Sequence, residues 1–129
     1  MRLLLDTHVA IWALMGRQRL PKTILDLLLE PSNVVHVSAV TVLEIAIKHV
    51  LQRRSAPPFS ASRAIEAFRE AGYLLIDITS NHAARVEMLP DLHGDPFDRL
   101  LVAQALAEPL RLVTHDSKVA AYSDSIIQF

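Results

Sequence analysis

Short, largely apolar runs alternate along the chain with longer stretches in which apolar residues recur at helical spacing. The runs end at polar residues, as buried strands of a parallel sheet do, and they predict strands at residues 2–5, 34–37, 74–78, 111–114 and 126–129. The stretches between them predict helices at residues 8–15, 22–30, 39–52, 61–71, 80–89 and 97–107. Strands that alternate with helices form a parallel sheet covered on both faces, so we expect an α/β fold.

Several of the predicted helices begin at recognisable start signals. Ser38 can cap the third helix, and Asp95 followed by Pro96 at the first helical position is typical of the start of the sixth. The segment RRSAPPFSAS at residues 53–62 is predicted to be a loop, because its two adjacent prolines exclude a helix there.

The composition favours one small domain with contacts to other molecules. The 129 residues contain no repeat, linker or change of composition that would divide them, so we expect a single domain at residues 1–129. A hydrophobic fraction of 51% is high for a small protein and suggests that part of the apolar surface meets a partner. No apolar run reaches the roughly 18 residues of a membrane span, so we expect a cytoplasmic protein without a membrane contact.

Cysteine content and net charge limit the kinds of active site and substrate contact that the chain can form. The chain has no cysteine, which excludes disulfides, thiolate metal sites and thiol nucleophiles. The formal net charge of −1 shows no basic excess of the kind that nucleic-acid-binding proteins often carry. Attraction for an anionic substrate must then be local, and the candidates are Lys48, His49, Arg53 and Arg54, which can equally be a solvated helix end.

Acidic residues recur just beyond the predicted strands. Asp6 and Asp116 each follow a strand, and ligands of open α/β sheets bind outside the carboxyl ends of the strands. Glu44 lies in the helix after the second strand, in one narrow polar line with Thr41 and Lys48. Each acid also has a simpler explanation, since the two aspartates can cap helices and Glu44 can pair with Lys48 on the surface.

The segment DPFDRLLVAQA at residues 95–105 holds two further aspartates. Asp95 is suited to cap the helix, and Asp98 lies near the positive end of the helix dipole. Both positions can be explained without chemistry. Asp98 is one turn into the helix, however, and can also project over the strand ends, so that one aspartate starts the helix and the other serves a site.

Four carboxylates at one rim of a sheet would repel one another unless a cation lay among them. Oxygen ligands without cysteine suit a hard divalent ion, Mg²⁺ or Mn²⁺. Zinc is disfavoured, because the histidines show no HExxH pattern. His93 and His115 lie beside the proposed acids in the sequence and are the histidines most relevant to such a site.

The pieces DTHVAIWAL, SAVTVLEIAIK, LPDLHGDPFDRLLVAQA and LVTHDSKV, in this order, resemble the PIN-domain family, and within it the VapC-type toxins of type II toxin-antitoxin systems. The resemblance extends from Leu3 to about Tyr122. It implies a three-layer fold in which helices flank a five-stranded parallel sheet of order 3-2-1-4-5. The chain departs from many relatives after Lys48, where HVLQRR replaces a common Gly-Lys-Leu turn.

The resemblance also implies a function and a site. The function is that of an endoribonuclease dependent on Mg²⁺ or Mn²⁺, which hydrolyses RNA phosphodiester bonds with a metal-activated water. The matching metal and catalytic positions are Asp6, Glu44, Asp98 and Asp116. The residues expected to support these acids or to contact substrate are Thr7, Lys48, Asp95, Arg99 and Thr114. Arg99 has a second interpretation as a surface partner of Asp95.

The partners that the resemblance implies are a cognate antitoxin, an RNA substrate and a second copy of the chain, with a higher toxin-antitoxin assembly as an extension. An alternative is a catalytically inactive PIN-like module that binds RNA or protein. Two other α/β phosphohydrolase-like classes fit poorly. A haloacid-dehalogenase-like enzyme needs Asp-x-Asp where the chain has Asp6-Thr7-His8, and a receiver domain has a paired acid and a lysine that are not evident here.

Overall fold

Five parallel strands form one sheet in the order β3-β2-β1-β4-β5. The structure is a computed structural model that describes residues 1–52, 54 and 56–129. The strands are β1 (Arg2–Leu5), β2 (Val34–Ser38), β3 (Leu74–Ile76), β4 (Arg111–Thr114) and β5 (Ile127–Gln128). The α/β class, the parallel sheet and the strand order expected from the sequence are confirmed.

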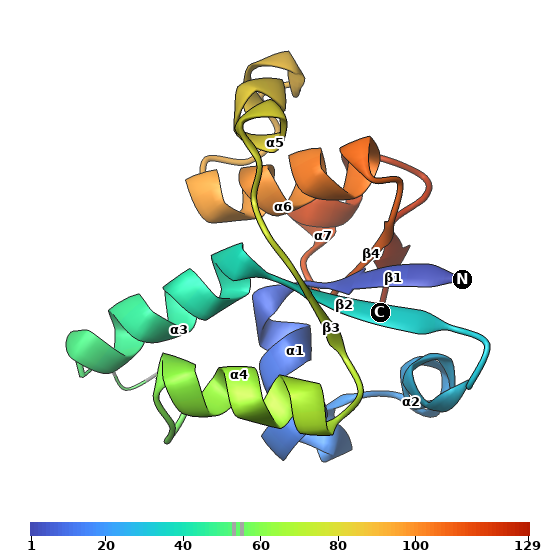
Figure 1. The fold of residues 1–129 in the computed structure, drawn as a ribbon. Coiled ribbons are helices and arrows are strands. Elements are labelled where there is room, and N and C mark those ends of the chain that lie inside the picture. The colour runs from blue at the N-terminus through green and yellow to red at the C-terminus, as the bar shows by residue number, and fades with distance from the viewer. Residues whose placement is uncertain (53, 55) are drawn as a thin grey trace.

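Helices connect the strands and cover the sheet. They are α1 (Thr7–Met15), α2 (Lys22–Leu29), α3 (Ala39–Val50), α4 (Ala61–Glu70), α5 (Ser80–Arg85), α6 (Pro96–Ala107) and α7 (Ser117–Ala120). Figure 1 shows α1, α2 and α4 on one face of the sheet and α6 and α7 on the other, with α5 beyond α6.

The alternation of side chains along β1 creates two separate cores. Leu3 and Leu5 point to one face and pack with residues of α1, α2 and α4. Leu4 points to the other face and packs with α6 and α7. All three leucines are fully buried, so replacing any one with alanine should cost about 2–5 kcal/mol. The central strand β1 therefore holds the helices on both faces in place relative to the carboxyl end of the sheet.

Some element ends differ from the sequence-based expectation. The strand expected at residues 74–78 ends at Ile76, because its partner β2 ends at Ser38 and leaves nothing further to pair with. The helix expected at residues 80–89 ends at Arg85 and continues as a 3₁₀ turn at Val86–Met88. The strand expected at residues 126–129 shortens to two residues, which pair with the end of β4.

The segment between α3 and α4 follows the prediction in part. α3 ends at Val50, two residues before the expected end, and α4 begins at Ala61 with Ser60 as its cap. Arg53 and Ser55 of the predicted loop lie outside the described residues. Within the described chain, no helix has the length and apolarity needed to cross a bilayer.

Candidate active site

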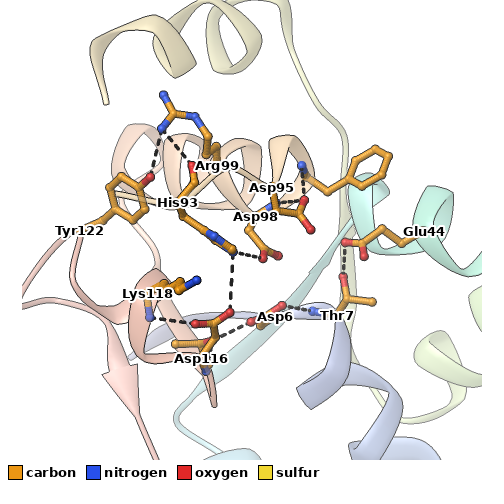
Figure 2. A network of polar contacts seen from close by, with 12 residues as sticks. Asp6, Thr7, Glu44, His93, Asp95, Asp98, Arg99, Asp116, Lys118 and Tyr122 are labelled. Carbon is orange, nitrogen blue, oxygen red and sulfur yellow. Dashed lines mark hydrogen bonds and ion pairs between the residues drawn. The ribbon is translucent and has the colours of Figure 1, made fainter. Parts of the chain in front are cut away.

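A pocket of about 650 Å³ opens at the carboxyl end of the sheet. Acids from four separate segments meet there, because β1 and β4 end beside each other and α3 and α6 overhang them. The carboxylates that line the pocket are Asp6, Glu44, Asp95, Asp98 and Asp116. The four acids singled out from the sequence thus lie together, and Figure 2 shows their side chains turned toward one another.

Asp6 is the most deeply buried of these acids, with 6% of its surface exposed. It sits at the N-cap of α1 and accepts the Thr7 backbone N–H at 2.6 Å. Its second oxygen accepts the Thr114 hydroxyl, also at 2.6 Å. Burial raises the pKa of Asp6 above its usual range, although both hydrogen bonds act in the opposite direction. The residue therefore caps a helix and also presents a constrained carboxylate to the pocket.

Glu44 reaches the pocket from the second turn of α3. Its carboxylate accepts a 2.7 Å hydrogen bond from the Thr7 hydroxyl, and that hydroxyl lies 3.0 Å from the hydroxyl of Thr41. When Glu44 is ionised it accepts the Thr7 proton, and the Thr41 hydroxyl is then the donor in the second contact. Burial, with repulsion from the aspartates of α6, raises the pKa of Glu44 to about 7. Lys48 lines the same pocket and offsets part of this rise.

The two aspartates at the start of α6 divide their roles. Asp95 is the N-cap, and one of its oxygens accepts the backbone N–H groups of Phe97 at 2.8 Å and Asp98 at 3.2 Å. The Asp98 side chain takes no part in capping and points toward Asp6 and Asp116 (Figure 2). Burial, followed by repulsion from Asp6, raises the pKa of Asp98 to about 6. Both carboxylates line the pocket.

His93 completes the acidic cluster. Its Nε2 lies 2.8 Å from Asp98 Oδ2 and 3.7 Å from Asp116 Oδ2. Asp116 also caps α7 by accepting the Lys118 backbone N–H at 2.8 Å. Ligand atoms of His93, Asp98 and Asp116 all lie within 4.8 Å of one another. Sequence reasoning noted His93 only for its position near the acids, and the loop before α6 is what turns its ring into the cluster.

Arg99 points away from the pocket (Figure 2). Its guanidinium donates to the carbonyls of Val86, Leu89, Pro90 and His93 and to the Tyr122 hydroxyl. Among the described residues it forms no ion pair with Asp95, which was one of its two interpretations. Its contacts instead fix the loop that carries His93 above Asp98.

The remaining cationic candidates differ in position. Lys48 lines the pocket, as described above. His49 and Arg54 are exposed, and neither lines the pocket. Arg53 lies outside the described residues. Lys48 is therefore the cation in the described part of this group that lies nearest to the acids.

The donor set of the pocket suits a hard divalent cation. Its acids offer only oxygen ligands, the ligand type that Mg²⁺ and Mn²⁺ prefer. Mutual repulsion contributes to the raised pKa values of Glu44 and Asp98, and a cation among the carboxylates would remove that repulsion. In the part of the chain that the structure describes, the ligand atoms grouped closely enough to share one ion are those of His93, Asp98 and Asp116, and Asp6 and Glu44 line the same pocket.

Solved structures with the same fold include toxin-antitoxin complexes. The chain aligns with VapBC2 from Rickettsia felis, bound to a DNA fragment from its promoter, with a TM-score of 0.71, 19% identity and coverage of 100% of this chain and 98% of that chain. A toxin-antitoxin complex from Klebsiella pneumoniae aligns with a TM-score of 0.67, 22% identity and coverage of 97% and 95%. VapBC-1 from nontypeable Haemophilus influenzae aligns with a TM-score of 0.64, 19% identity and coverage of 100% and 97%.

Sequence comparison identifies the family. A search of curated proteins finds no match to the chain. The family model of the PIN domain matches residues 3–124, nearly the whole sequence. This match agrees with the strand order and with the acidic pocket at the carboxyl end of the sheet. The chain belongs to the PIN domain family.

Proposed function

We propose that residues 1–129 form one PIN domain that acts as an endoribonuclease, the VapC-type toxin of a type II toxin-antitoxin pair. The observation that carries the proposal is the meeting of Asp6, Glu44, Asp98 and Asp116, from four segments of the chain, in one pocket. Independent helix caps and surface pairs have no reason to converge in this way. The raised pKa values of Glu44 and Asp98 support a site that is completed by positive charge.

The cofactor in this proposal is Mg²⁺ or Mn²⁺, held by Asp6, Asp98 and Asp116 with Glu44 nearby. When bound, the ion supplies activation of a water molecule and neutralisation of negative charge on the attacked phosphate. The protein contributes pre-positioned ligands, since Thr7 and Thr114 fix Asp6 and His93 orients Asp98. Hydrolysis leaves a 5′-phosphate and a 3′-hydroxyl.

Glu44 has a distinct part in the proposed reaction. Its pKa is about 7 in the protein without metal, and a cation among the acids would lower that pKa, so that near neutral pH its carboxylate can accept a proton. The Thr7 hydroxyl holds one of its oxygens in place at 2.7 Å. We assign Glu44 to proton transfer at the edge of the acidic cluster, and Lys48, one helical turn away, to contact with an RNA phosphate.

The proposed partners are a cognate antitoxin and a second copy of the chain, in a higher toxin-antitoxin assembly. Solved toxin-antitoxin complexes with the same fold support the antitoxin partner. Apolar side chains exposed on and just after α3 also support it, since they suit a protein contact. These side chains are Leu43, Ile47, Val50 and Leu51. We place the protein in the cytoplasm, where its RNA substrate is found.

Cleavage of a mixed RNA pool tests the proposal. The purified protein is incubated with Mg²⁺ or Mn²⁺, or with EDTA, beside Asp6→Asn and a control, Asp124→Asn, which removes an exposed acid outside the pocket. We expect cutting by the wild type and Asp124→Asn with metal, and none by Asp6→Asn or with EDTA. Metal-independent cutting, or full activity of Asp6→Asn, would contradict the proposed chemistry.

The biological half of the proposal needs a separate test. Expression of the wild type in a bacterial host should arrest growth, and expression of Asp6→Asn at the same level should not. If wild-type protein binds RNA without cutting it under any metal condition, the chain is instead the inactive binding module considered above.

A further inference from the structure

Rings from three positions form a wall of the pocket beside the acids. We call His8, Trp12 and His115 the aromatic wall, and all three line the pocket. The centroid of the Trp12 ring lies 6.0 Å from that of His8 and 5.7 Å from that of His115. His8 is two residues after Asp6, and His115 directly precedes Asp116, so the wall and the acidic cluster share the same two chain segments.

Core packing accounts for only part of this wall. Trp12 is half-buried and packs against the core of its face of the sheet. His8 and His115 are exposed and add nothing to that core. The His115 ring is nevertheless held in place, because it stacks on Phe129 with centroids 4.8 Å apart and its Nδ1 is hydrogen-bonded to the Phe129 carbonyl oxygen. An exposed ring that is fixed in this way is preorganised for binding, because it loses little conformational entropy when a ligand contacts it.

Charge and size indicate the kind of ligand. The Arg19 guanidinium lies 5.6 Å from the centroid of the Trp12 ring, and Lys48 lines the same pocket. The pocket therefore combines a group of acids with a wall of rings, and a cation lies over the Trp12 ring of that wall. Its volume of about 650 Å³ is in the range of sites for whole small molecules and exceeds what a metal ion with a few waters needs.

We propose that the aromatic wall stacks one unpaired base of a single-stranded RNA, beside the phosphodiester that lies at the acidic cluster. Unstacked bases of single strands bind aromatic and histidine rings through their π-faces, which requires no base-specific hydrogen bonds. The inference rests on the proposed function, because it identifies which part of the RNA lies next to the reacting phosphate. It also restricts the substrate to segments whose bases can leave a helix.

The chain's single tryptophan makes the wall directly observable. Trp12 is the only tryptophan in the sequence, so the intrinsic tryptophan fluorescence reports on the wall alone. Wild-type protein in Ca²⁺, which replaces Mg²⁺ among oxygen ligands, is titrated with a short single-stranded RNA and with an abasic strand of the same phosphate count. We expect quenching by the base-bearing strand and little quenching by the abasic strand.

A matched pair of variants at position 115 separates the effect of ring stacking on RNA binding from the effect of side-chain size. His115→Phe and His115→Leu both lose the hydrogen bond to Phe129, but only His115→Phe keeps a ring. We expect His115→Leu to bind a labelled RNA about fivefold to a hundredfold more weakly than His115→Phe, as measured by fluorescence anisotropy. Equal affinities of the two variants, equal quenching by the two strands, or no quenching by either would overturn the aromatic wall as a base platform.

The fluorescence titration, read beside the cleavage assay, distinguishes this inference from the proposed function. Metal-dependent RNA cleavage without Trp12 quenching would support the nuclease function and contradict base stacking on the aromatic wall. Base-dependent quenching by a protein that cuts no RNA with Mg²⁺ or Mn²⁺ would support base stacking on the aromatic wall and contradict the nuclease function.

Discussion

The Thr114 hydroxyl donates a 2.6 Å hydrogen bond to Asp6 Oδ2 and thereby joins the carboxyl ends of β4 and β1. The same hydroxyl oxygen accepts the backbone N–H of Asp116 at 3.0 Å. Thr114 is fully buried, so water cannot replace either contact. One threonine therefore positions two of the acids of the proposed metal centre.

Thr114→Val should test this relationship, because valine keeps the shape of threonine and removes both hydrogen bonds. Leaving buried partners unpaired costs about 1–3 kcal/mol, and we expect a loss of this size in urea unfolding. Mn²⁺ should also bind more weakly, as measured by calorimetry. Thr114→Ser, which keeps the hydroxyl, serves as the control. Equal Mn²⁺ affinity of the Val and Ser variants would show that the hydroxyl does not position the acids.

The raised pKa values of Glu44 and Asp98 predict how stability depends on pH without metal. A carboxyl whose pKa is higher in the folded state than in the unfolded state binds more protons when folded. The stability that Glu44 contributes is fully present below its unfolded pKa of 4.5 and is lost as pH rises through about 7. The stability that Asp98 contributes is fully present below its unfolded pKa of 3.8 and is lost as pH rises through about 6. Asp6 acts in the same direction.

Thermal unfolding in EDTA between pH 4 and pH 8 measures this dependence. We expect Tm to fall as pH rises through the range from about 5 to about 7, and Glu44→Gln to flatten the curve, because glutamine stays neutral. Each 1 kcal/mol corresponds to about 4 °C in a domain of this size. Glu87→Gln, which changes an exposed glutamate outside the pocket, should follow the wild type. A Glu44→Gln curve parallel to the wild type would refute the assignment to Glu44.

Divalent metal should reverse the loss at high pH. Cations compete with protons for the same carboxylates, so Mn²⁺ should raise Tm more at pH 8 than at pH 5.5. Asp6→Asn should abolish most of this rise, and Asp124→Asn should retain it. A rise that is independent of pH, or equal in the two variants, would place the Mn²⁺ elsewhere on the protein.

Arg99→Lys should loosen the loop that carries His93 without removing its positive charge. Lysine cannot reproduce the planar set of donors that Arg99 offers to the backbone carbonyls of residues 86–93. We expect amides of residues 86–94 to exchange hydrogen about tenfold faster, with core strands unchanged. The control is Arg69→Lys on the exposed side of α4. Unchanged exchange in this loop would mean that Arg99 does not hold it.

The strands could be predicted from the sequence because β1, β2 and β4 are buried and therefore largely apolar, and a polar residue lies at or just after the end of each. The strand order came from the resemblance to a family rather than from the pattern itself. The end of β3 could not be predicted from the sequence, since the length of β3 depends on where its partner β2 ends. Pairing across the sheet is a property of the fold and leaves little trace in the local sequence.

The acids of the site were readable for a similar reason. Asp6 directly follows β1 and Asp116 lies two residues after the end of β4. Asp95 and Asp98 fit a helix-start pattern in which only one aspartate can cap. Arg99 was harder to assign, because its partners are backbone carbonyls, which every residue carries. His93 reaches Asp98 through the shape of a loop that Arg99 holds, so no local spacing predicts it.

The central claim is that Asp98 is a metal ligand and that Asp95 is a helix cap. The most direct measurement compares metal-dependent RNA cleavage by Asp98→Asn and Asp95→Asn, with circular dichroism to confirm folding of both. Asparagine caps helices as well as aspartate does. We predict that Asp98→Asn loses Mn²⁺-dependent cleavage and that Asp95→Asn keeps most of it. Full cleavage by a folded Asp98→Asn, or equal losses in both variants, would contradict the account.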